Sequence, residues 1–91
     1  MPTQVKIAIN ARHLTGGQAV IEAEGQTVAE ALADLSAKYP LLGEMLFAPD
    51  GTPRRFLNFY VNGEDIRFRQ GLATPLAPGD QLLLLSAVGG G

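Results

Sequence analysis

The sequence contains no cysteine and a single histidine, His13. Without a thiol, the chain cannot form a disulfide, a thiolate metal site, an iron–sulfur cluster or a cysteine nucleophile. One imidazole is too few for a histidine-based nucleophile pair or a histidine-rich metal site. We therefore expect neither catalysis by this chain nor a bound metal. The lack of cysteine is also compatible with the reducing cytoplasm, which is the location we expect.

Long apolar runs and a strong net charge are lacking as well. The longest leucine run, residues 82–85, is far too short to span a membrane. Residues 1–6 do not have the pattern of a secretory signal. A formal net charge of −2 gives no general attraction to nucleic acid or to an anionic membrane surface. The sequence predicts a soluble protein with no nucleic acid and no membrane among its partners.

The 91 residues suffice for one small domain, and its first half shows three periodic segments. Alternating apolar and polar residues predict strands over residues 5–14 and 19–24, joined into a hairpin by a turn at residues 15–18. Thr27 and Glu30 have the spacing of a capping box, in which each side chain bonds a backbone N–H of the other end. The helix that follows is amphipathic and ends at Pro40. Its apolar face is Val28, Ala31, Leu32, Leu35 and Tyr39.

The second half begins with a less regular segment, residues 40–55, which predicts one or two helical turns before a turn at residues 49–51. Aromatic and β-branched residues predict a strand over residues 56–61, followed by the Asn62–Gly63 turn and a short return segment at residues 64–68. Residues 81–86 are predicted to form the last strand.

This order of elements predicts an α+β fold of the ubiquitin-like β-grasp type, a mixed sheet of four to five strands with one main helix packed on one face. The first and last strands are expected side by side in the centre of the sheet, which suits the apolar last strand. We expect a β-grasp domain over residues 1–86 and a flexible glycine tail over residues 87–91.

The tail has an unusual composition, because it ends in Gly89, Gly90 and Gly91. Glycine has no Cβ, so such a segment is both thin and pliable and can enter a narrow channel. Its only reactive group is the terminal carboxylate of Gly91. We expect Ala87, Val88, Gly89 and Gly90 to thread into partner enzymes. The alternative is a frayed end without a function.

With its β-grasp order and glycine end, the chain resembles the ubiquitin-like sulfur carriers of the ThiS/MoaD family. The most specific similarity covers residues 54–68, RRFLNFYVNGEDIRF, then residues 71–74 and Gly79–Asp80. This combination is most similar to the subgroup that delivers sulfur for cysteine synthesis. The subgroup commonly has alanine at the position of Gly89, while Gly90 and Gly91 keep the terminal pair.

The resemblance implies that an E1-like enzyme adenylates the Gly91 carboxylate with ATP and that a sulfur donor then converts it to a thiocarboxylate. The chain itself would bind no cofactor and would be a substrate, not an enzyme. Its sulfur would pass to an enzyme such as a cysteine synthase, with a zinc-dependent peptidase as a further partner. We expect a monomer when the protein is free.

Other functions remain open at this stage. The sulfur could serve molybdopterin synthesis, thiazole synthesis or tRNA thiolation. The activated Gly91 could also be transferred to lysine amines, as in a ubiquitin-like protein modifier. A third class is an interaction module whose glycine tail does nothing.

Strand parity predicts a docking surface, because successive side chains of a strand point to opposite faces of the sheet. Asn58 and Gln81 mark the outer face, so the partner-docking patch predicted there consists of Phe56, Tyr60, Leu83 and Leu85. The arginines Arg54, Arg55, Arg67 and Arg69 could add a basic patch for an acidic partner or form an ordinary solvated face.

Overall fold

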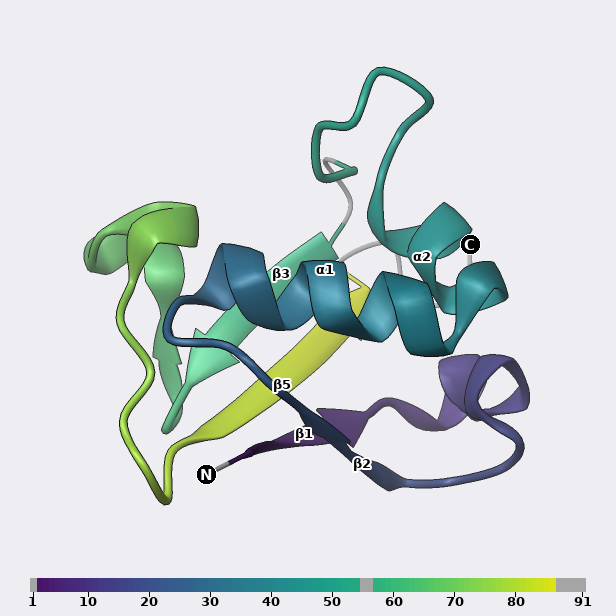
Figure 1. Cartoon of the computed structure of the whole chain (residues 1–91), viewed down its shortest axis with the longest axis horizontal. Coiled ribbons are helices and arrows are strands. Elements are labelled where there is room, and N and C mark those ends of the chain that lie inside the picture. Colours follow the sequence, from purple (N-terminus) through teal and green to yellow (C-terminus); the bar gives the residue numbers. More distant parts are fainter. Residues whose placement is uncertain (1, 55–56, 87–91) are drawn as a thin grey trace.

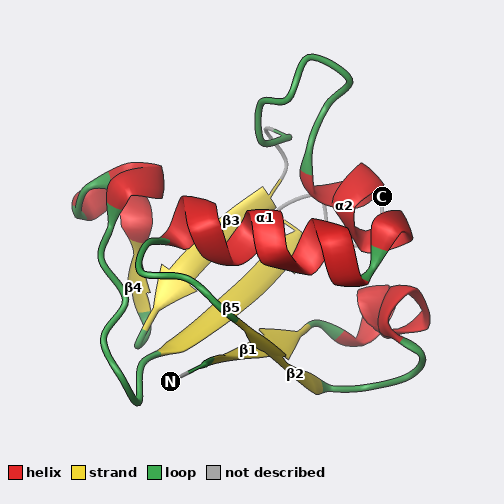
Figure 2. Cartoon of the chain, viewed as in Figure 1, coloured by secondary structure: helices red, strands yellow, loops and turns green. Residues whose placement is uncertain are grey.

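The computed structural model describes residues 2–54 and 57–86 of the chain. Its strands and α-helices are β1 (Thr3–Ile7), β2 (Val20–Ala23), α1 (Val28–Lys38), α2 (Pro40–Leu46), β3 (Leu57–Val61), β4 (Glu64–Asp65) and β5 (Gln81–Ser86) (Figure 2). Three short 3-10 helices cover Ile9–Thr15, Ile66–Phe68 and Gly71–Ala73. None of the helices within the described ranges has the length and apolarity that a membrane crossing requires.

The strands form one five-stranded mixed sheet in the order β2-β1-β5-β3-β4. β1 and β5 run parallel, whereas the other neighbouring strands are antiparallel. The first and last strands therefore lie side by side, with β5 in the middle of the sheet (Figure 1). This arrangement confirms the predicted β-grasp topology and the predicted bounds of the last strand.

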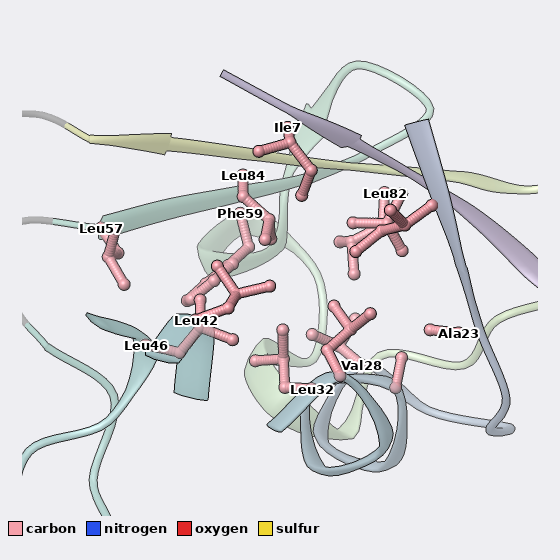
Figure 3. Packing of buried hydrophobic residues seen from close by; sticks show 14 of the residues in the cluster. Ile7, Ala23, Val28, Leu32, Leu42, Leu46, Leu57, Phe59, Leu82 and Leu84 are labelled. Atoms are coloured by element: carbon pink, nitrogen blue, oxygen red, sulfur yellow. The ribbon is translucent and has the colours of Figure 1, made fainter. Parts of the chain in front are cut away.

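The main helix, α1, lies across one face of the sheet and closes the core (Figure 1). Val28 and Leu32 of α1 face the side chains of Leu82 and Leu84, as Figure 3 shows, and all four are buried. Thr27 accepts a hydrogen bond from the N–H of Glu30 at 3.2 Å, as predicted for the cap. The Glu30 carboxylate bonds the N–H of Gln26 at 2.8 Å and not that of Thr27, so the capping box reaches one residue further back.

The strand predicted over residues 5–14 is too long. β1 ends at Ile7, and residues Ile9–Thr15 form a 3-10 helix before the turn. The N–H of Ala11 bonds the carbonyl of Ala8 at 2.9 Å, and Arg12 Nε donates to the carbonyl of Ile7 at 3.1 Å. These local hydrogen bonds take the place of the bonds to a neighbouring strand that a longer β1 would make. Ala11 is buried in this conformation. The antiparallel pairing of β1 with β2 is as predicted.

Residues 40–46 form α2, in agreement with the predicted helical turns, and Pro40 stands at its start, where a missing N–H costs nothing. Leu42 and Leu46 are buried in the core, while Leu41 is 62% exposed. Gly43 packs so closely on α1 that a Cβ there would lie 2.9 Å from Cβ of Ser36. The two helices thus cover adjoining parts of the core.

The predicted Asn62–Gly63 turn joins β3 to β4, with positive φ angles of 52° and 85° that suit these two residues. The return segment predicted over residues 64–68 is only partly a strand, because β4 stops at Asp65. The Asp65 carboxylate accepts the N–H of Arg67 at 2.9 Å and starts the 3-10 helix Ile66–Phe68. Only two residues of β4 therefore pair with β3.

Candidate functional site

The predicted tail follows directly on β5, the central strand. All of its residues lie outside the described part of the chain, namely Ala87, Val88, Gly89 and Gly90, which are predicted to thread into partner enzymes, and Gly91, the predicted adenylation site. The division of the chain at residue 86 stays a prediction as well. Ser86, the last described residue, is opposite Leu57 of β3. The described part of the site is therefore the sheet that carries the root of the tail.

The two faces of β3 and β5 are assigned as strand parity predicted. The side chains that face α1 are buried, namely Leu57, Phe59, Val61, Leu82 and Leu84. On the opposite face, Tyr60 and Leu83 are half-buried and Leu85 is 37% exposed. Phe56, the fourth residue of the predicted docking patch, lies outside the described residues. The assignment of faces is confirmed, whereas docking on this face remains a prediction.

The register of the sheet brings part of this patch together. Tyr60 is opposite Leu83, and Asn58 is opposite Leu85, across the antiparallel pair of β3 and β5. Directly opposite side chains on neighbouring strands have Cβ atoms roughly 5 Å apart, close enough to present one continuous surface. Tyr60, Leu83 and Leu85 therefore form an apolar patch beside the root of the tail.

Sequence reasoning missed two residues that extend this face across the sheet. Lys6 of β1 is opposite Leu83 on one side and opposite Val20 of β2 on the other. Val20 is 46% exposed, and Lys6 is exposed. The alternation of Val5 and Ile7 already implies that Lys6 points away from the core. Combining that parity with the expected pairing of the first and last strands would have found it.

An ion pair lies next to Tyr60, at the edge of this face that β4 forms. Asp65, opposite Tyr60, accepts hydrogen bonds from Nε and Nη2 of Arg67, the latter at 2.7 Å. This contact with the Arg67 guanidinium, together with the Arg67 N–H, holds the pKa of Asp65 below its ordinary value. The same contact raises the pKa of Arg67. The edge of the face at β4 is therefore closed by a charge pair that is satisfied within the chain.

The predicted basic patch is mostly occupied by local contacts. Arg69 Nε lies 3.5 Å from the carboxylate of Glu64, and Arg54 Nε donates to the carbonyl of Glu44 at 3.0 Å. Arg67 is paired with Asp65 as above, and Arg55 lies outside the described residues. These contacts favour the solvated-face interpretation for the three described arginines.

The acidic residues at the turns have structural roles. The N–H of Ala77 and the amide of Asn62 bond the Asp80 carboxylate at 2.8 Å each, and they hold its pKa below the ordinary value. The hydroxyl and the N–H of Thr52 donate to the Asp50 carboxylate at 2.7 and 3.0 Å and hold the pKa of Asp50 below its ordinary value. Within the described ranges, no group of three or more His, Asp or Glu side chains is placed to hold a metal ion.

Comparison with known proteins also covers the tail, because the model of the ThiS family matches residues 5–91. The chain belongs to the ThiS family. Among its relatives, the sulfur carrier protein CysO of Mycobacterium tuberculosis is 44% identical over 93 residues, which cover 100% of each chain. The family predicted from the sequence is thereby confirmed.

Solved structures similar to this ThiS-family chain confirm the β-grasp fold. A chain of the BexX/CysO complex of Amycolatopsis orientalis has a TM-score of 0.86 and 38% identity, and the match covers 98% of this chain and 99% of that one. The small archaeal modifier protein 1 of Methanosarcina acetivorans has a TM-score of 0.90 and 29% identity, with coverage of 99% and 96%.

Proposed function

We propose that this protein is a sulfur carrier for cysteine biosynthesis, whose Gly91 carboxylate is adenylated and then converted to a thiocarboxylate. The observation that carries the proposal is the 44% identity to the sulfur carrier protein CysO over the full length of both chains. This identity confirms the sulfur-carrier function that was predicted from the sequence. The chemistry at Gly91 and the assignment to cysteine biosynthesis are the proposal.

The chemistry explains why a carrier needs only a carboxylate. A free carboxylate is a poor electrophile, because its leaving group would be oxide. Attack of the Gly91 carboxylate on the α-phosphate of ATP releases pyrophosphate and gives an acyl-adenylate. Hydrosulfide supplied by a sulfur donor then attacks the acyl carbon, AMP leaves with the bonding electron pair, and a thiocarboxylate remains. Its sulfur is a nucleophile that requires no cysteine in the chain, which agrees with a sequence that has none.

In this proposal the chain is a substrate and its partners supply the catalysis. An E1-like enzyme binds the ATP, and the thiocarboxylate sulfur is accepted by a cysteine synthase. A zinc-dependent peptidase then releases the cysteine formed on the tail. The CysO chain of Amycolatopsis orientalis has been solved in a complex with BexX, which supports a role for such carriers in binding other proteins.

The outer face of the sheet has the features of a docking surface for these enzymes. Tyr60, Leu83 and Leu85 expose apolar surface on two adjacent strands, and β5 leads directly into the tail. Contiguous apolar patches on a small domain usually mark a partner site. We propose that this face fixes the domain while the tail reaches the active site of the activating enzyme.

Removal of Gly91 tests the role of the tail. The shortened carboxylate would no longer reach the α-phosphate, so pyrophosphate exchange with the cognate activating enzyme should be abolished. Circular dichroism should be unchanged, because the described core ends with β5. Undiminished exchange by the shortened chain would exclude Gly91 from the mechanism.

One observation favours a second candidate function. The small archaeal modifier protein 1 of Methanosarcina acetivorans has a TM-score of 0.90 with this chain, and its name describes a protein modifier. Transfer of the activated Gly91 to lysine amines would share the adenylation step. Isopeptide-linked ladders in the cells that produce the protein would support the modifier, and their absence together with a thiocarboxylate would support the carrier.

A further inference from the structure

On the outer face of the described sheet, Lys6 places a cation between apolar side chains. Its central row runs from Val20 of β2 through Lys6 of β1 and Leu83 of β5 to Tyr60 of β3. β1 lies between β2 and β5, so Lys6 has an apolar neighbour on each side (Figure 1). The ion pairs among the described residues are Lys38–Asp34, Arg67–Asp65 and Arg69–Glu64, and none includes Lys6.

Any partner that covers Leu83 must also cover Lys6. Neighbouring strands are roughly 4.8 Å apart, and these two residues are directly opposite one another. In the free protein Lys6 is exposed, so its ammonium is hydrated and carries no desolvation cost. In a complex it loses that water, and a charge buried without a counter-charge is strongly unfavourable.

We infer that the activating enzyme presents a carboxylate opposite Lys6, surrounded by apolar side chains that meet Val20, Leu83 and Tyr60. This inference rests on the proposed function, since it assumes that an adenylating enzyme docks on the face beside the tail root. Charge complementarity of this kind fixes the register of two surfaces and excludes partners that are purely apolar. Lys6 thus selects the partner, while the apolar residues supply the contact area.

A carboxylate within the chain is the nearest competitor. Glu22 of β2 lies on the same exposed face, opposite Gln4, and is therefore a diagonal neighbour of Lys6. In a face-to-face pair of two copies, Glu22 of one copy could serve as the counter-charge for Lys6 of the other. The experiment must therefore separate the enzyme from a second copy of this chain.

Replacement of Lys6 by methionine distinguishes an enzyme surface with a carboxylate from one that is only apolar, because the two predict opposite changes in the KM for the carrier. Methionine keeps the apolar stem and removes the charge. If the enzyme has the carboxylate, Lys6→Met leaves it buried without a partner, and the KM for the carrier in pyrophosphate exchange should rise about tenfold or more. If the enzyme surface is only apolar, Lys6→Met removes a desolvation cost and the KM should fall, which would overturn the inference.

Matched variants complete the test. Lys6→Arg keeps a positive charge opposite the carboxylate, so most of the Coulomb attraction remains and the KM should stay within about threefold of the wild type. Lys38→Met removes the other lysine of the sequence, which lies on α1 and contacts Asp34 and the Glu22 carbonyl, so the KM should not change. The rise of the wild-type KM with salt concentration should be weaker for Lys6→Met.

Two further outcomes would contradict the inference without touching the tail chemistry. Unaltered KM values for Lys6→Met and Lys6→Glu would place the docking surface elsewhere, provided that the maximal exchange rate is normal. A wild-type dimer in sedimentation experiments that Lys6→Glu dissociates would identify a second copy as the occupant. Absence of exchange even for the wild-type protein would instead count against the proposed function.

Discussion

Among the described glycines, Gly25 is the one that leaves the least room for a side chain. It stands between β2 and α1 with a φ of 152°, and a Cβ there would lie 2.8 Å from the backbone nitrogen of Ala31 and from Cβ of Glu30. The first turn of α1 cannot shift easily, because Thr27 caps it and the N–H of Val28 bonds the carbonyl of Thr74 at 3.0 Å. The glycine thus allows the chain to pass close to the start of the helix.

Gly25→Ala should lower the free energy of unfolding by roughly 2 to 4 kcal/mol, because steric overlap adds to backbone strain. Gly51→Ala is the matched control. Its φ is 89°, but nothing lies within 4 Å of a Cβ at that position, so only a backbone cost of about 1 kcal/mol is expected. Urea denaturation followed by circular dichroism measures both. Equal losses would show that close packing at Gly25 does not matter.

At the scale of elements, β5 contributes both to the core and to the proposed docking face within one strand. Leu82 and Leu84 point to α1 and are buried, whereas Leu83 and Leu85 point to the other face. The strand therefore has one buried side and one side that is partly exposed to solvent.

Aspartate substitutions at neighbouring positions of β5 should differ in effect, one on folding and the other on activation by the enzyme. Burying even a neutral polar group without a partner costs about 2 to 7 kcal/mol, and an ionised carboxylate costs more, so Leu82→Asp should unfold the domain. Leu83→Asp should leave a folded protein that the enzyme activates poorly. Circular dichroism and pyrophosphate exchange check the pair. A folded Leu82→Asp with an unfolded Leu83→Asp would invert the face assignment, and normal exchange by Leu83→Asp would exclude it from docking.

The elements that could be predicted are those in which periodicity and burial act together. β5 and α1 each have one apolar face against the core, so their positions follow from alternation and helical spacing. The 3-10 helix Ile9–Thr15 could not be predicted that way. Ile9 and Ala11 continue the alternation of β1, and what ends the strand is a set of local bonds, including that of Arg12 to the carbonyl of Ile7. β4 is shortened for a similar reason at Asp65.

At the scale of the whole molecule, the sheet has one face covered by α1 and another that the described helices leave open (Figure 1). Parity within a strand predicted Tyr60, Leu83 and Leu85 on that open face. Lys6 and Val20 belong to the same face only through the pairing of β1 with its two neighbours, which is a long-range contact. The geometry of the tail itself lies outside the described residues.

The central claim is that Gly91 carries sulfur, and the intact mass of the protein isolated from its own cells tests it most directly. The expected result is a species heavier than the unmodified chain by the exchange of one oxygen for sulfur, located at Gly91 by fragmentation and absent from a chain that lacks Gly91. A Gly91 carboxylate that remains unmodified under conditions of active cysteine synthesis, or that is found only in isopeptide linkage to lysines, would contradict it.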